Sequence, residues 1–169
     1  MSNRLLVARL AGLVPEPGSA RARVTIRPVR ATDTEDVATL YHAAYDGQWS
    51  IREAIDDIVG NFEGRCGTLI AESSLVAVHG TSRRILGAVF TVTGAPWPDT
   101  PQGAFVIDIF VSQQFRRQGI ARALMLAAMA SAPGDSIHLR VEDDNASAIR
   151  LYESLGFSDA TRESGDSAR

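Results

Sequence analysis

The residues that most clearly indicate a binding function directly follow Val111. An apolar run that ends at Val111 is succeeded by a loop of basic and amide residues, and a helical pattern begins near Gly119. The first turn of a helix has backbone NH groups without internal partners and carries partial positive charge, so it attracts anions. Gly119 has no side chain and Ala121 has only a methyl group, so a phosphate can approach the backbone closely. The sequence therefore predicts a phosphate-binding loop. Three arginines supply its formal charge: Arg116, Arg117 and Arg122.

A single carboxylate interrupts an otherwise apolar strand. Asp108 lies within residues 104–111, whose other members are aliphatic or aromatic. Burial of an ionised carboxylate is costly without a partner, so Asp108 is a candidate functional group. A proton-accepting role and a substrate-orienting or structural role both fit this position.

Asn145 and Tyr152 are seven residues apart, which is about two helical turns. If a helix begins at Asn145, both side chains project from nearly the same face and can reach one ligand. A tyrosine hydroxyl with a pKa of ~10 is protonated at neutral pH and can give its proton to a leaving group. Periodicity alone also allows Tyr152 to be a core aromatic packed with Ala148 and Leu155, and Asn145 to be a plain N-cap.

These residues need a mixed set of strands and helices to position them. Apolar alternation and helical spacing predict strands at 24–29, 68–78, 85–93, 104–111 and 137–141, and helices at 34–45, 51–60, 118–130 and 146–155. Thr32 and Glu35 have the spacing of a capping box before the first helix. The polar segment 79–84 suggests that the strands on either side of it form an antiparallel pair.

Length and composition indicate one globular domain. The 169 residues are 45% hydrophobic and 22% charged, and the net charge of −3 gives no support for nucleic-acid binding. Cys66 is the single cysteine, which excludes an internal disulfide and favours a reducing, cytoplasmic compartment. The three histidines lack metal-ligand spacing, so no metal is expected. Residues 1–20 are predicted to form an N-terminal arm that is too short and too interrupted to span a membrane.

Three motifs in the same order resemble the GNAT superfamily of acyl-CoA-dependent N-acyltransferases. Residues 116–121 resemble its pyrophosphate loop, residues 145–157 resemble its second signature, and residues 26–33 resemble its first strand. The resemblance implies an α/β (α+β) GNAT fold for residues 21–169: a mixed, mostly antiparallel twisted sheet flanked by helices, with a shortened C-terminal end. A dinucleotide site of Rossmann type is disfavoured because no acidic ribose partner follows at the expected spacing.

The resemblance also implies roles for individual residues. Acetyl-CoA is the expected acyl donor, and its pantetheine arm is expected to pair with the backbone of residues 109–111. The Val111 NH is expected to stabilise the oxyanion that develops during the reaction, and such stabilisation is often worth ~3 kcal/mol. Tyr152 is the implied general acid, and Asp108 lies beside the acceptor amine. The implied cofactor-binding residues are Ile109, Phe110, Val111, Arg116, Arg117, Gln118, Gly119, Ile120, Ala121, Arg122 and Asn145. Four aromatics lie in segments that line the acceptor pocket in this family, with a scattered core role as the alternative: Tyr41, Tyr45, Trp49 and Trp97.

The expected activity is direct acetyl transfer to a primary amine of a small molecule or a protein N-terminus. A non-catalytic GNAT-fold module that binds CoA or regulates another protein is the alternative. The expected partners are a small-molecule amine or a peptide, without nucleic acid or membrane. Residues 158–169 are too short for the two strands that usually end this fold, so the strand at 137–141 is expected to have an open edge. We expect the N-terminal arm to cover it, within the chain or across a homodimer.

Overall fold

The computed structural model describes residues 2–11 and 23–160. Its strands are β1 (Asn3–Arg9), β2 (Val24–Pro28), β3 (Thr68–Leu69), β4 (Leu75–His79), β5 (Ile85–Thr93), β6 (Ala104–Val111), β7 (Ser136–Glu142) and β8 (Ser158–Asp159). Its helices are α1 (Thr34–Ala44), α2 (Ile51–Phe62), α3 (Ile120–Ser131) and α4 (Ala146–Ser154), with short 3-10 turns at Ala31–Asp33 and Gln113–Phe115.

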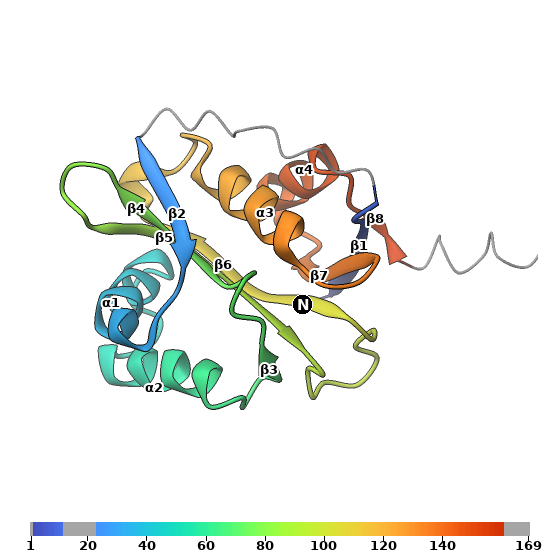
Figure 1. Cartoon of the computed structure of the whole chain (residues 1–169), viewed down its shortest axis with the longest axis horizontal. Coiled ribbons are helices and arrows are strands. Elements are labelled where there is room, and N and C mark those ends of the chain that lie inside the picture. The colour runs from blue at the N-terminus through green and yellow to red at the C-terminus, as the bar shows by residue number, and fades with distance from the viewer. Residues whose placement is uncertain (1, 12–22, 161–169) are drawn as a thin grey trace, which may run out of the picture.

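All described strands belong to one sheet, in the order β2-β4-β5-β6-β7-β1-β8, with β3 paired to β5. Every pairing is antiparallel except that of β6 with β7. Helices α1 and α2 cover one face, and α3 and α4 cover the other (Figure 1). Each face buries its own apolar cluster, one beneath each pair of helices. This arrangement confirms the predicted mixed, mostly antiparallel sheet flanked by helices.

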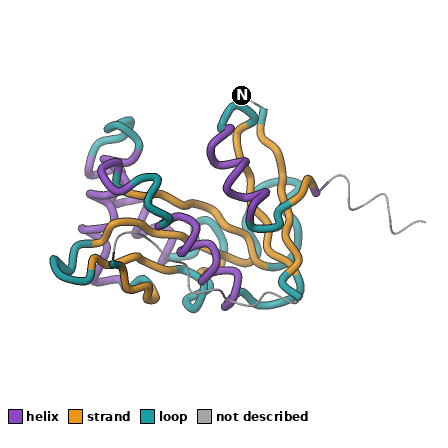
Figure 2. Tube along the Cα trace, turned by 90° about the horizontal axis from the view of Figure 1, so that it is seen from above, coloured by secondary structure: helices purple, strands orange, loops and turns teal. Residues whose placement is uncertain are grey.

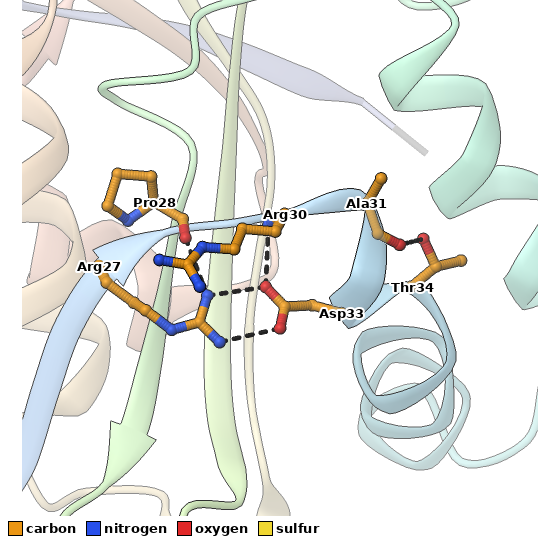
Figure 3. Close-up of polar contacts among 6 residues, drawn as sticks. All are labelled: Arg27, Pro28, Arg30, Ala31, Asp33 and Thr34. Atoms are coloured by element: carbon orange, nitrogen blue, oxygen red, sulfur yellow. Dashed lines mark hydrogen bonds and ion pairs between the residues drawn. The ribbon is translucent and has the colours of Figure 1, made fainter.

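The start of α1 is fixed by an ion pair rather than by the expected capping box. The Arg27 guanidinium donates two hydrogen bonds to Asp33, at 2.7 and 2.8 Å, and the Arg30 NH donates to the same carboxylate at 2.9 Å. Figure 3 shows these contacts. The predicted box between Thr32 and Glu35 was wrong, because the chain first makes a 3-10 turn and Asp33 becomes the residue before the helix. The contact joins β2 to α1.

The segment predicted as one strand at 68–78 is two strands. β3 and β4 are separated by a turn at 70–74, in which the Ser74 hydroxyl donates to the Thr91 carbonyl and the Thr91 hydroxyl donates to the Ser73 carbonyl, both at 3.0 Å. These bonds satisfy polar groups that are fully buried in β5 and the turn. The pairing of β4 with β5 confirms the predicted antiparallel pair.

The N-terminal segment completes the sheet beside β7. β1 pairs antiparallel with β7 from Asn3 opposite Glu142 to Arg9 opposite Ser136, and the two-residue strand β8 pairs with the other side of β1. The expectation that this segment covers the edge of the strand at 137–141 is confirmed, within the chain itself. The proposed boundary between residues 20 and 21 lies outside the described residues.

Candidate functional site

β6 has one extra residue next to Asp108. Val106 and Asp108 are opposite consecutive residues of β5, so Ile107 forms a β-bulge. A bulge reverses the face to which the following side chains point. Val106 packs in the cluster beneath α3, whereas Phe110 packs in the cluster beneath α1 and α2. The bulge thereby turns Asp108 towards α1, where the Tyr45 hydroxyl donates a 2.8 Å hydrogen bond to its Oδ1.

β6 and β7 separate after a short paired stretch. Their register runs only from Ala104 opposite Ile137 to Val106 opposite Leu139. Figure 2 shows the strands in two groups that lie together at one end and diverge at the other. A cavity of about 270 Å³ lies between the diverging ends. Its wall includes Tyr45, Asp108, Ile109, Arg140, Asn145 and Tyr152.

Asp108 has an unusual proton affinity for a carboxyl group. Burial raises its pKa from 3.8 to about 6, and the charge of Asp57 adds to this rise. Hydrogen bonds from the Tyr45 hydroxyl and from the Ile109 backbone oppose the rise, because both favour the ionised form. A carboxylate with this pKa is mostly ionised at pH 7 and can still accept a proton from a reacting group.

α4 presents its two candidate residues to the same cavity. Asn145 is the N-cap residue, and its side chain accepts a 3.1 Å hydrogen bond from the Ala148 NH. Tyr152 is buried, with its ring 5.7 Å from that of Phe157. Burial and then the charge of Asp108 raise the pKa of Tyr152 to about 12, so its hydroxyl keeps its proton throughout the neutral range. Each of these residues therefore has a structural contact and also lines the cavity.

The loop before α3 has the backbone shape of an anion site. Gly119 precedes the helix at φ 84°, and Arg117 has φ 61°, which is uncommon for a residue with a side chain. Alternation of left-handed and ordinary residues turns successive NH groups to one side of a loop. The exposed Arg117 side chain has no hydrogen bond or ion pair within residues 2–11 and 23–160.

The other predicted cofactor-binding side chains are largely engaged within the protein. The Arg116 guanidinium donates to the Ala44 carbonyl at 2.8 Å and to the Val111 carbonyl at 3.4 Å, and Arg122 donates to the Ser154 hydroxyl at 2.9 Å. Core positions are taken by the side chains of Phe110, Val111 and Ile120. Gln118 donates to the Gln114 carbonyl at 3.4 Å. Residues 116–122 do not line the cavity. The candidate site therefore has two parts, the loop before α3 and the cavity between β6 and β7.

Sequence reasoning did not identify Tyr45 as a partner of Asp108. Tyr45, Tyr41 and Trp49 pack together, with ring centroids 5.0–5.4 Å apart, whereas Trp97 lies against Phe105 at 6.4 Å. Tyr45 and Asp108 are separated by 63 residues in the chain, and no spacing rule connects them. Arg140 also lines the cavity and had no sequence signal; its guanidinium donates to the Pro98 carbonyl at 2.9 Å.

Within residues 2–11 and 23–160, no group of three or more His, Cys, Asp or Glu side chains is arranged to hold a metal ion. In the same residues, no helix combines the length and the apolar character needed to cross a bilayer.

The chain is similar to known proteins in sequence. The family model described as Acetyltransferase (GNAT) family matches residues 34–157. An N-alpha-acetyltransferase of Saccharolobus solfataricus is 39% identical over 64 residues, which cover 36% of this chain and 38% of that protein. A [Ribosomal protein bS18]-alanine N-acetyltransferase of Escherichia coli is 39% identical over 61 residues, which cover 34% of this chain and 41% of that protein. The match thus spans about two fifths of the length of these relatives.

Solved structures share the fold. The ribosomal-protein-S18-alanine N-acetyltransferase from Escherichia coli aligns with a TM-score of 0.57 and 25% identity over 81% of this chain and 79% of its own. AAC(6')-Iy, solved in complex with the bisubstrate analog CoA-S-monomethyl-acetylneamine, aligns with a TM-score of 0.62 and 18% identity over 82% of this chain and 92% of its own.

Proposed function

Because the chain belongs to the acetyltransferase (GNAT) family, we propose that it is an acetyl-CoA-dependent N-acetyltransferase that transfers an acetyl group directly to a primary amine. One observation carries the proposal: Asp108 of β6 and the α4 residues Asn145 and Tyr152 line one cavity where β6 and β7 diverge. This cavity offers a proton acceptor with a pKa of about 6 and a hydroxyl that stays protonated. A general base and a general acid of this kind accelerate the aminolysis of a thioester.

The donor fits the open edge of β6 and the loop that follows it. Beyond Val106, β6 is paired on the side of β5 but not on the side of β7, so the backbone groups in this stretch that do not bond to β5 face the divergence. Polar backbone groups need partners when a ligand covers them, and an extended amide arm supplies such partners. We assign the pantetheine arm to this edge and the pyrophosphate to the backbone NH groups around Gly119, with Arg117 as the cation.

The reaction follows from the positions of the side chains. The neutral amine attacks the thioester carbonyl, a C–N bond forms, and the Val111 NH stabilises the negative oxygen. Asp108 takes a proton from the amine, directly or through water. As the C–S bond breaks, Tyr152 gives its proton to the sulfur and then regains one from the protonated Asp108 across the shared cavity. The same burial that raises the pKa of Tyr152 raises that of a thiol, so the sulfur is a suitable acceptor.

The acceptor is assigned to two chemical classes, a small amine or a protein N-terminus. The names of the two relatives support the second class, and the ligand of AAC(6')-Iy supports the first. We assign the acceptor side of the cavity to the end of α1, because Asp108 faces that helix.

The test is CoA release measured against a panel of small amines and short peptides with free N-termini, for the parent protein, Tyr152→Phe and Asp108→Asn. We expect amine-dependent release by the parent and losses of roughly 10²–10⁴-fold in each variant. Acetyl-CoA should raise the melting temperature of all three proteins, while NAD and ATP should not. Binding of acetyl-CoA with no release against any acceptor would overturn the proposal in favour of a non-catalytic CoA-binding module.

A further inference from the structure

Tyr45 is the residue through which α1 reaches the cavity. It is the C-cap residue of α1, and its hydroxyl lies 2.8 Å from Oδ1 of Asp108. Both side chains belong to the cavity wall that also contains Tyr152. Within the described residues, Tyr45 provides the one side-chain hydrogen bond to Asp108.

The ring of Tyr45 is held from several sides. Its centroid lies 5.0 Å from that of Tyr41, 5.3 Å from that of Trp49 and 6.5 Å from that of Phe110. The first two are edge-on contacts and the third is tilted, so the rings fix the tilt of Tyr45 as well as its depth. The direction of its hydroxyl is therefore set by packing.

The backbone that carries Tyr45 is fixed to the loop after β6. Arg116 donates to the Ala44 carbonyl at 2.8 Å, and Gln113 donates to the Ala43 carbonyl at 3.0 Å and to Asp46 at 2.5 Å. These carbonyls are among the last of α1, which lack partners within the helix. The loop after β6 thus holds the end of α1 in place, and with it the backbone of Tyr45.

The remaining groups around Asp108 do not replace Tyr45. Three other side chains interact with Asp108 through charge alone: Tyr152 of α4, Asp57 of α2 and Tyr41 of α1. Two charged residues of β7, Arg140 and Glu142, also line the cavity. Burial and the charge of Asp108 raise the pKa of Tyr45, so its hydroxyl remains a donor at every working pH.

We propose that Tyr45 is a positioning residue for Asp108, holding one carboxylate oxygen so that the other faces the acceptor amine. This inference rests on the proposed function, in which Asp108 accepts the amine proton. The Tyr45 hydroxyl favours the ionised carboxylate and offsets part of the effect of burial on its pKa. It thereby keeps Asp108 ready to accept a proton at neutral pH, without touching the reacting atoms itself.

The test is the pH dependence of kcat/KM for Tyr45→Phe, with Tyr41→Phe as the matched control. Tyr41 belongs to the same aromatic cluster but donates no hydrogen bond to Asp108 within the described residues. Loss of a hydrogen bond to a charged group should raise the pKa of Asp108 by roughly one unit. From a parent pKa of about 6, kcat/KM at pH 6 should then fall about fivefold relative to the parent, and little at pH 9. Ionisation of the amine is common to all proteins and cancels in the ratio.

A second measurement separates this inference from the proposed function. The carboxyl carbon of Asp108, assigned by its absence in Asp108→Asn, is titrated by NMR in the parent and in both tyrosine variants. A higher pKa of Asp108 in Tyr45→Phe, but not in Tyr41→Phe, supports the inference, even for a protein that shows no turnover. An equal loss of activity at all pH values with an unmoved carboxyl titration would overturn it, because Tyr45 would then act only through packing.

Discussion

Replacing Asp108 with asparagine should stabilise the folded protein at alkaline pH while it removes activity. The pKa of Asp108 is raised from 3.8 to about 6 by burial, so the folded chain holds a proton between these pH values that the unfolded chain releases. Stability that depends on this proton is complete below pH 3.8 and is lost as the pH rises through about 6. Asparagine has no such proton, and its carbonyl oxygen can still accept the hydrogen bond from Tyr45.

The magnitude follows from the two pKa values. They differ by 6 − 3.8, about two units, which corresponds to an ionisation penalty of about 3 kcal/mol at pH 8. At pH 4.5 the same linkage leaves a penalty of about 1 kcal/mol. Packing changes caused by the substitution are common to both conditions. The stability of Asp108→Asn relative to the parent should therefore rise by about 2 kcal/mol between pH 4.5 and pH 8.

Urea unfolding at the two pH values measures this difference directly. Asp99→Asn is the matched control, because Asp99 is exposed in the loop between β5 and β6 and adopts a left-handed conformation that asparagine tolerates. It removes a carboxylate from the surface of the protein, whereas Asp108→Asn removes one from the cavity wall. A constant difference between Asp108→Asn and the parent at both pH values would refute the reasoning, since it would mean that the folded protein does not hold Asp108 at a raised pKa.

Three further substitutions test other parts of the structure. Gly119→Ala should lower the affinity for acetyl-CoA and destabilise the protein by ~1 kcal/mol. The control Gly156→Ala, at a similar φ with open space around it, should cost similar stability and leave the affinity intact. Equal affinities of the two variants in a thermal-shift titration would contradict binding of acetyl-CoA by the loop around Gly119. Arg27→Ala should lower the free energy of unfolding in urea by about 1–3 kcal/mol at pH 7. The loss should become smaller as the pH falls through the lowered pKa of Asp33, where that carboxylate takes up a proton. A loss that is independent of pH would exclude the ion pair as its source. Leu6→Ala should cost about 2–5 kcal/mol because Leu6 is 3% exposed, and a cost near zero would mean that β1 does not belong to the sheet in solution.

Much of the fold could be predicted from the pattern of residues. The strands at 85–93 and 104–111 have the bounds that apolar runs and flanking polar segments predicted, because a strand covered on both faces consists mostly of apolar residues. The break in 68–78 was missed, since two buried serines replace the polar surface residues that usually mark a turn. The Ser74 hydroxyl and the Ser73 carbonyl both bond to Thr91 in a neighbouring strand, and a sequence does not reveal such partners.

The sequence predicted candidate residues of the site, but it predicted their relative arrangement only within one helix. Asn145 and Tyr152 lie on one helix, so their spacing predicted a shared face, and both line the cavity. The direction of Asp108 depends on the bulge at Ile107, and strict alternation along the strand would have placed Asp108 on the face of Val106. The contact with Tyr45 in turn depends on that direction, so the sequence pattern could not predict it.

The same structural logic gives β1 a role in the site, although none of its residues lines the cavity. β7 must leave β6 to open the cavity, and it shares only three residue pairs with that strand. A strand held along so short a stretch would expose its remaining backbone groups and would not have a fixed position. β1 pairs with β7 at seven positions on the opposite side, and Arg4 adds a 3.0 Å contact to Asp143 just before α4. The position of Tyr152 relative to Asp108 therefore depends on β1, which holds the wall of the cavity from outside.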